Sequence, residues 1–248
     1  MIPILGHSHS LSGAAAGLTA GILLHKTLPA TAVLATFTAG TALLPDLDST
    51  GSCAARCFGW LSRPVAYVIR FTSGGHRHST HSVIGVAIFT GLAILACHYR
   101  HDYAGMAGLA FLVALSVSAG LEALRVSRFL PLPRMLRHGH GEDLAGVLAA
   151  AAVVWGGYGL ALIPLAVALG CATHIIGDML TDSGCMLAYP FSSFRFHLLF
   201  EPLSFTTGTD PERYVVDPLL GISLAALAGL AIDPAAGPLV WTHLAHYV

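Results

Sequence analysis

Long apolar runs, each closed by a short polar segment, recur along this sequence and restrict the folds open to it. They extend over residues 11–24, 30–44, 83–97, 103–121, 144–173 and 215–232. Runs of this length with so little charge form helices in a membrane or in a large core. Composition decides between the two, because 10% of the residues are charged, against about 25% in soluble domains, and the mean hydropathy is +0.72. The sequence therefore predicts a polytopic membrane protein.

The polar segments divide these runs into helical hairpins. Runs 11–24 and 30–44 form the first, and runs 83–97 and 103–121 form the second. Run 144–173 exceeds the about 20 residues of an untilted membrane helix, and Gly156–Gly159 offers a break that makes it a third hairpin. We predict an all-α fold, a polytopic membrane helical bundle built from helical hairpins, with metal-site residues at helix ends on one side. A single domain spans 1–248, and 213–248 supplies its C-terminal apolar helices.

The polar segments also carry most of the positive charge. Of the 12 Lys and Arg residues, only Lys26 and Arg100 fall on the opposite side of the predicted bundle. The positive-inside rule then places the polar side in the cytoplasm, although arginines that belong to a site would not count toward topology. Residues 49–74 are expected to be an irregular connection whose Trp60–Phe71 segment is interfacial. The formal net charge of -1 argues against nucleic-acid binding through a basic field.

The densest polar segment, Gly75–Ser82, lies directly before run 83–97. It contains His76, His78 and His81 together with Arg77. Neutral imidazole is a common metal ligand, and Arg binds phosphate or carboxylate in a bidentate manner. The simpler interpretation is a helix N-cap, supplied by Ser79 or Thr80, with histidines that are merely interfacial. The segment by itself leaves both interpretations open.

Two further segments supply carboxylates and imidazole. Asp46 and Asp48 end run 30–44, where they serve either as an ordinary helix-ending turn or as paired charges that need a cation or base between them. His174 and Asp178 are four residues apart, so they lie on one face of a helix, and Thr181 and Asp182 continue that face. The alternative for this pair is a buried hydrogen bond that joins helices.

The predicted hairpins bring all these segments together at one side of the bundle. A mixed His/Asp set suits Zn or Mn, and more than four candidate ligands leave room for two ions. A pair of ions can clamp the attacking and leaving oxygens of a phosphoester and supply hydroxide at neutral pH. Arg77 would hold an anionic substrate there.

These segments resemble the motifs of a known family, the LexA-binding, inner-membrane-associated metal-dependent hydrolases, also called the YdjM-like family. The matching blocks, which run from about residue 7 to 212, are His9 with Gly13, Pro45–Asp48, His76–Ser82, His174–Asp178 with Thr181 and Gly184, Tyr189–Ser192, and Thr207–Gly208 with Glu212. The family is distantly similar to zinc-dependent phospholipase C and the single-strand-specific nucleases. Two features depart from its pattern, namely the inserted His78 and the segment His138–Asp143, which is expected to be a solvated loop.

The resemblance implies a multi-pass hydrolase of the bacterial inner membrane that acts on a phosphoester of a lipid or lipid-linked substrate through a metal-activated water. The implied cofactor is one to three divalent ions, Zn or alternatively Mn. The expected ligands are His9, Asp46, Asp48, His76, His81, His174 and Asp178, with Glu212, His78 and Thr181 as further candidates. Arg77 and Thr80 are expected to orient the substrate, and Asp48 is also assigned a catalytic role.

Two other classes of function fit the same residues. A transporter for divalent metals or protons would place His and Asp near the midplane with access from both sides. A non-catalytic scaffold would hold a structural metal in a closed ligand sphere. The placement of every candidate at helix ends on one side favours the enzyme. His7, His197 and Glu201 are left open as site residues, as are the substrate and the oligomeric state.

Overall fold

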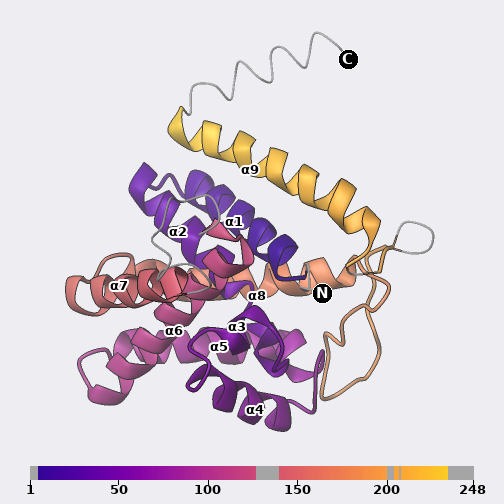
Figure 1. Ribbon diagram of the computed structural model, residues 1–248, viewed down its shortest axis with the longest axis horizontal. Coiled ribbons are helices and arrows are strands. Elements are labelled where there is room, and N and C mark those ends of the chain that lie inside the picture. Colours follow the sequence, from indigo (N-terminus) through magenta and orange to yellow (C-terminus); the bar gives the residue numbers. More distant parts are fainter. Residues whose placement is uncertain (1–4, 127–139, 200–203, 207, 234–248) are drawn as a thin grey trace.

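The computed structural model describes residues 5–126, 140–199, 204–206 and 208–233, and the described chain is a bundle of helices (Figure 1). The α-helices are α1 (Leu5–Leu23), α2 (Leu28–Thr41), α3 (Cys53–Arg56), α4 (Ser62–Thr72), α5 (Val83–His98), α6 (Tyr103–Ala123), α7 (His140–Gly156), α8 (Ile163–Met179) and α9 (Asp217–Ile232). Short helical turns are η1 (Pro45–Asp48), η2 (Ser79–His81), η5 (Leu160–Leu162) and η6 (Glu212–Val216). Among the described residues β pairing is limited to isolated bridges, which confirms the all-α prediction.

The first two predicted hairpins are present as pairs, α1 with α2 and α5 with α6. The third predicted hairpin is only partly present. The chain does break at Gly157 and Gly159, which adopt positive φ, but α7 packs on α6, whereas α8 packs on α1, α2 and α5 at the centre of the bundle (Figure 1). The connection between them, which contains the η5 turn, lets α8 separate from α7. The C-terminal half of the long apolar run thereby becomes the central helix that carries part of the site.

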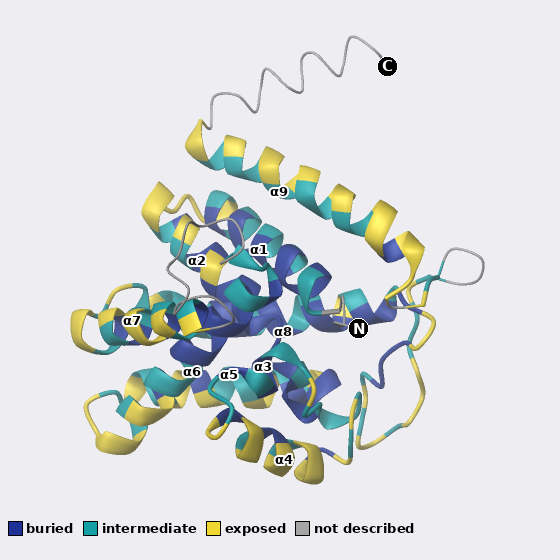
Figure 2. Cartoon of the chain, in the orientation of Figure 1, coloured by how far each residue is buried: buried dark blue, intermediate teal, exposed yellow. Residues whose placement is uncertain are grey.

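Small residues set the distance between the central helices. A Cβ placed on Gly17 of α1 would lie 2.6 Å from Cα of Ala35 in α2. A Cβ on Gly170 of α8 would lie 2.7 Å from the backbone nitrogen of Ala42. Only glycine permits such close approach. The buried residues lie along α2, α6 and α8, while α9 covers one flank of α1 and is largely exposed (Figure 2).

The prediction of an irregular connection over residues 49–74 is wrong. This segment contains α3, which is N-capped by the Ser52 hydroxyl, and α4, an eleven-residue helix that contacts η1. Gly59 lies between the two helices and Gly74 lies beyond them, and both have positive φ. The buried residues of α4, Ser62 and Ala66, are one turn apart, so one face of this helix packs on the bundle.

Four segments of the described chain are long and apolar enough to span a membrane, namely Leu28–Asp48, Tyr103–Ala123, Leu160–Met179 and Glu212–Ile232. Helix α5 is apolar but shorter. Exposed aromatic side chains gather where α5 meets α6 and α7 meets α8, at Tyr99, Tyr103, Trp155 and Tyr158. These connections lie together, because the Cys97 thiol contacts the Leu160 carbonyl at 3.8 Å. An aromatic girdle of this kind is typical of a membrane–water interface, so the fold is a helical membrane bundle.

Candidate metal centre

A set of imidazoles and carboxylates gathers where α2 and α8 end and where α1 and α5 begin. Asp46 and Asp48 lie in η1, His81 in η2, and His174 and Asp178 in the last turns of α8. His81, His174 and Asp48 have no exposed surface, and Asp178 is 1% exposed. Burial of so many ionisable groups costs free energy unless they are paired or hold a cation. This cluster therefore needs a compensating charge arrangement.

Two ring nitrogens and two carboxylate oxygens lie close together at the central point of the cluster. Nε2 of His81 and Nε2 of His174 are 3.1 Å apart. The His81 nitrogen lies 3.6 Å from Oδ1 of Asp46 and 3.5 Å from Oδ2 of Asp178, and the His174 nitrogen lies 3.7 Å from both oxygens. A tetrahedral zinc ion with bonds of about 2.0–2.1 Å requires ligand atoms about 3.3 Å apart. The separations of each carboxylate oxygen from the two nitrogens are close to this value, so Asp46, His81 and His174 offer a candidate position for one ion beside Asp178.

The outer nitrogens of both histidines orient the inner ones. Nδ1 of His174 lies 2.7 Å from the carbonyl oxygen of Ala42, which can only accept, so this nitrogen carries the proton. Nδ1 of His81 lies 3.3 Å from Oδ2 of Asp48 and 3.0 Å from the Thr80 hydroxyl. Neutral rings held in this way direct the Nε2 lone pair toward the central point. The same arrangement orients metal-binding histidines in general.

Asp48 accepts hydrogen bonds from the polar loop Gly75–Ser82. Its oxygens accept from the backbone N–H of Arg77 at 3.0 Å and from the Thr80 hydroxyl at 2.6 Å, and Nδ1 of His76 lies 2.6 Å away. Arg77 has φ of 63°, a strained value for a non-glycine residue, which turns its N–H toward Asp48. Ligand atoms of Asp48, His76 and His81 lie within 4.8 Å of one another, so they offer a second candidate position for an ion.

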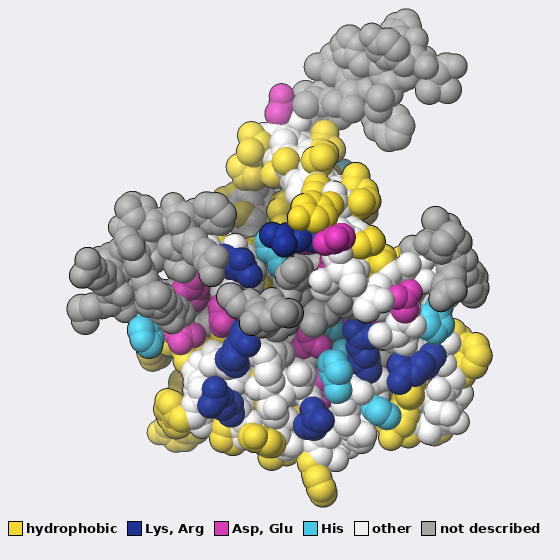
Figure 3. Space-filling view, turned by 45° about the vertical axis from the view of Figure 1, so that its right-hand side comes forward, with side chains coloured by type: hydrophobic (Ala, Val, Ile, Leu, Met, Phe, Trp, Pro, Cys, Tyr) yellow, Lys and Arg dark blue, Asp and Glu magenta, His cyan; other side chains and the backbone are white. Residues whose placement is uncertain are grey.

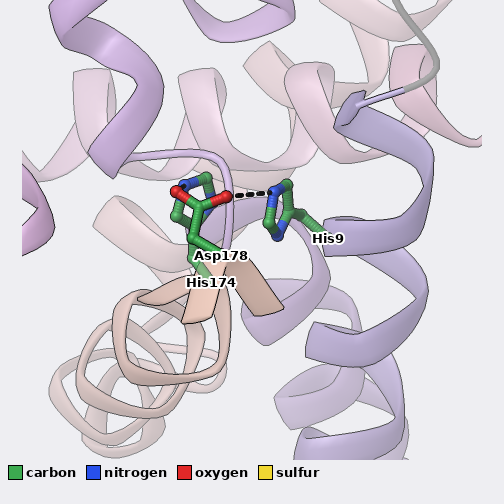
Figure 4. Close-up of side chains that lie close together, drawn as sticks. All are labelled: His9, His174 and Asp178. Carbon is green, nitrogen blue, oxygen red and sulfur yellow. Dashed lines mark ion pairs between the residues drawn. The ribbon is translucent and has the colours of Figure 1, made fainter. Parts of the chain in front are cut away.

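His9 and Arg77 complete the cluster on the opposite side of Asp178. Nε2 of His9 lies 3.5 Å from Oδ1 of Asp178, and its ring stacks on His174 with centroids 3.8 Å apart (Figure 4). The guanidinium of Arg77 donates to the same Oδ1 at 3.1 Å. Asp178 therefore presents one oxygen to the central point and the other to His9 and Arg77. His9, His174 and Asp178 form a third group with metal-ligand spacing.

The electrostatic environment of His81 favours a bound cation. Burial lowers the pKa of this imidazole, but hydrogen bonds to Asp46 and Asp48 and the charge of Asp178 outweigh burial and raise the pKa to about 9. The carboxylates thus stabilise positive charge at this position. A proton or a metal ion supplies that charge.

Several predicted candidates lie outside the cluster. His78 contacts the His76 carbonyl and the Tyr189 ring, and His7 contacts the Ala123 carbonyl. The Thr181 hydroxyl donates to the Asp178 carbonyl.

Asp182 does not continue the face of His174 and Asp178, because α8 ends at Met179 and the Asp182 carboxylate instead accepts from Thr206. His197 packs beside Gly184. Glu201, Thr207 and His138 lie outside the described residues. His140–Asp143 form the first turn of α7, not a solvated loop, and Glu142 is buried.

Glu212 is buried and accepts from the Ser8 hydroxyl at 2.5 Å and from the Gly208 N–H at 2.6 Å. Ser8 also donates to Asp217 at 2.8 Å, so the start of α9 is attached to α1 one residue before His9. Sequence reasoning missed Ser8, although its position beside His9 was a usable signal. It also missed Cys185, whose thiol lies 3.8 Å from Oδ2 of Asp178.

The N-cap of α5 is Ser82, whose hydroxyl accepts from the Gly85 N–H at 3.2 Å, and not Ser79 or Thr80. The Thr80 hydroxyl instead donates to Asp48. The capping interpretation of the polar loop and the ligand interpretation therefore involve different residues.

Comparison with known proteins adds one finding. The model of a family described as YdjM inner membrane protein matches residues 4–232, nearly the whole chain. No curated protein and no solved structure matches.

Proposed function

This chain belongs to the YdjM inner membrane protein family, and we propose that it is a membrane-embedded metal-dependent hydrolase acting on a phosphoester of a lipid or lipid-linked substrate. The observation that carries the proposal is the set of Asp46, His81, His174 and Asp178, in which the two Nε2 atoms lie 3.1 Å apart and each lies 3.5–3.7 Å from an oxygen of both carboxylates. Two neutral imidazoles and two carboxylates suit Zn, or alternatively Mn. A bound ion would act as a Lewis acid and lower the pKa of water to about 7.

The residues around this set have roles that follow from their contacts. Asp48 and the Ala42 carbonyl hold His81 and His174 in the ligating orientation. His9 and His76 border candidate positions for further ions, which keeps a count of one to three open. Arg77 uses one amino group for Asp178, so its remaining donors can bind phosphate oxygens in the bidentate manner typical of arginine. Thr80, buried against Asp48, positions the loop that carries Arg77.

The position of the cluster supports a lipid substrate. Asp46 and Asp48 end one candidate span, and His174 and Asp178 end another, so the cluster lies at the membrane boundary where lipid phosphates lie. Basic and histidine side chains gather on this face (Figure 3). Lys26 and Arg100 lie in the turns at the other ends of the helices, and under the positive-inside rule the small amount of positive charge there supports a cluster on the cytoplasmic side of the inner membrane.

A divalent-metal or proton transporter is the alternative, since it could use the same cluster. The grouping of the ligands at one end of the bundle favours the enzyme, because transport needs a site reached from both sides. Metal held without hydrolysis, together with ion flux into vesicles, would select the transporter.

The proposal is tested by elemental analysis of the detergent-purified protein and by phosphoester hydrolysis before and after chelation. The wild type should carry at least one equivalent of Zn or Mn, and His81→Ala and Asp178→Asn should lose it. His78→Ala is the matched control in the same loop and should retain metal. Chelation should abolish hydrolysis, and added metal should restore it in the wild type and in the control. Wild-type protein that stays metal-free under metal-replete conditions would remove the basis of the proposal.

A further inference from the structure

Helix α4 carries a stripe of large apolar side chains that point away from the protein. Tyr67, Val68 and Phe71 are 62%, 63% and 89% exposed, and Trp60, just before the helix, is 85% exposed. At about 100° per residue the three positions within the helix fall within an arc of about 100°. Ser62 and Ala66, which are buried against the bundle, lie on the opposite face. The stripe therefore has no covering partner among the described residues, and water is a poor environment for it.

The position of α4 relates this stripe to the membrane surface. Helix α4 contacts η1, which is the end of the candidate span Leu28–Asp48, and the Arg70 guanidinium lies 3.4 Å from the Asp48 carbonyl. A helix attached to the end of a membrane span lies at the level of the lipid headgroups. Its exposed stripe therefore lies at that level as well.

Charge on α4 suits the same environment. Arg63 and Arg70 are exposed and, at helical spacing, share one border of the apolar stripe. Cations beside an aromatic stripe are typical of helices that lie in the membrane plane among anionic lipids. A second segment on this side of the bundle has exposed aromatic residues as well, at Phe191 and Phe194. That segment is held beside η2, because the Leu187 carbonyl accepts from the Val83 N–H at 3.1 Å.

We propose that α4 lies flat in the headgroup layer on the side of the metal centre, with Trp60, Tyr67, Val68 and Phe71 among the acyl chains. Arg63 and Arg70 lie at the level of the phosphates of anionic lipids. Since α4 packs on η1, this contact also fixes the depth of Asp46 and Asp48 relative to the bilayer. The proposal depends on lipid contact alone and holds whether or not the metal centre is catalytic.

The test uses Trp60 as a natural probe, with Trp155→Phe and Trp241→Phe making it the sole tryptophan. The protein is reconstituted in vesicles of phosphatidylcholine and phosphatidylglycerol that carry bromine either near the headgroup or near the chain ends. Bromines near the headgroup should quench Trp60 several-fold more than those near the chain ends, and aqueous iodide should quench it weakly. Quenching should increase with phosphatidylglycerol, and Arg63→Gln should reduce that increase, whereas Lys26→Gln should not.

Other outcomes would overturn the proposal in distinct ways. Strong iodide quenching without bromine quenching would mean that the stripe faces water. Protection from both quenchers would mean that a second copy or another protein covers it. Stronger quenching by bromines at the chain ends would place the stripe deep in the bilayer instead of in the headgroup layer.

Discussion

The Nε2 atoms of His81 and His174 face each other across 3.1 Å in the buried centre of the bundle. His174 donates its Nδ1 proton to a backbone carbonyl, and Nδ1 of His81 faces the Asp48 carboxylate. If both rings are neutral and carry their protons on Nδ1, their two lone pairs point at each other, which is unfavourable without a cation between them. A proton on one ring or a metal ion between the rings resolves this conflict. The two alternatives compete, and the competition has measurable consequences.

Replacement of Asp48 by asparagine should weaken metal binding without abolishing it. The amide oxygen of the variant can still accept from the Arg77 N–H, but the side chain no longer supplies negative charge to Nδ1 of His81. Loss of such an orienting partner typically costs about 10–100-fold in metal affinity. Competition titration against a zinc chelator measures the effect, and Asp46→Asn should lose binding far more severely. Equal loss in both variants would instead make Asp48 a direct ligand.

Metal affinity should increase with pH. The pKa of His81 is raised to about 9 in the metal-free protein, so at neutral pH a proton must leave before Nε2 can bind an ion. Apparent affinity should therefore rise about tenfold per pH unit between about pH 7 and 8 and level off above about pH 9. Calorimetry in buffers of different protonation enthalpy should detect release of about one proton per ion. Binding that is independent of pH would contradict a protonated His81.

The metal-free protein should lose stability over the same range. A group whose pKa is higher in the folded state than its ordinary 6.5 stabilises the fold fully below pH 6.5, and this contribution disappears as the pH rises through about 9. Thermal unfolding of the chelated protein in detergent should show a falling midpoint between these values. The metal-loaded protein should show a smaller decline, because the ion replaces the proton.

Ser8→Ala should destabilise the attachment of α9 without changing metal content. The substitution leaves buried Glu212 without one of its donors, which costs about 1–3 kcal/mol. Thermal unfolding measures the loss, and Ser12→Ala, which removes a hydroxyl that bonds within α1, is the matched control. Loss of bound metal in Glu212→Gln would identify Glu212 as a further ligand.

Gly40→Ala should disrupt the crossing of α2 and α6. The added methyl group would overlap the backbone of Ser116, and overpacking of this kind costs about 1–3 kcal/mol or more. Gly91→Ala is the control, because nothing among the described residues lies within 4 Å of its Cβ position and alanine favours helix. Gly40→Ala should lower the unfolding midpoint in detergent, whereas Gly91→Ala should not. Equal midpoints would mean that the crossing can relax.

Sequence patterns predicted the helices well where a long apolar run carried the signal. The break at Gly156–Gly159 and the four-residue spacing of His174 and Asp178 both appear as expected. Helix α4 was missed because its large exposed residues Tyr67, Val68 and Phe71 face outward and its fully buried residues are only Ser62 and Ala66, so no long apolar run marks it. Helix α1 begins at Leu5, before the apolar run 11–24 that predicted it. The prediction began too late because His7 and His9 do not resemble helix-core residues, yet both lie on α1.

The sequence by itself determined which chemical groups this protein brings to one end of a membrane bundle, because apolar runs of membrane length place their flanking His and Asp residues at helix ends. Only the tertiary structure decided the role of each group. Asp46 and Asp48 are two residues apart, yet one oxygen of Asp46 faces the central point, whereas Asp48 faces the outer nitrogen of His81. That difference depends on the direction of side chains from η1 and on the packing of α8 between α1, α2 and α5. Such directions arise from contacts between segments far apart in the chain, which local spacing does not encode.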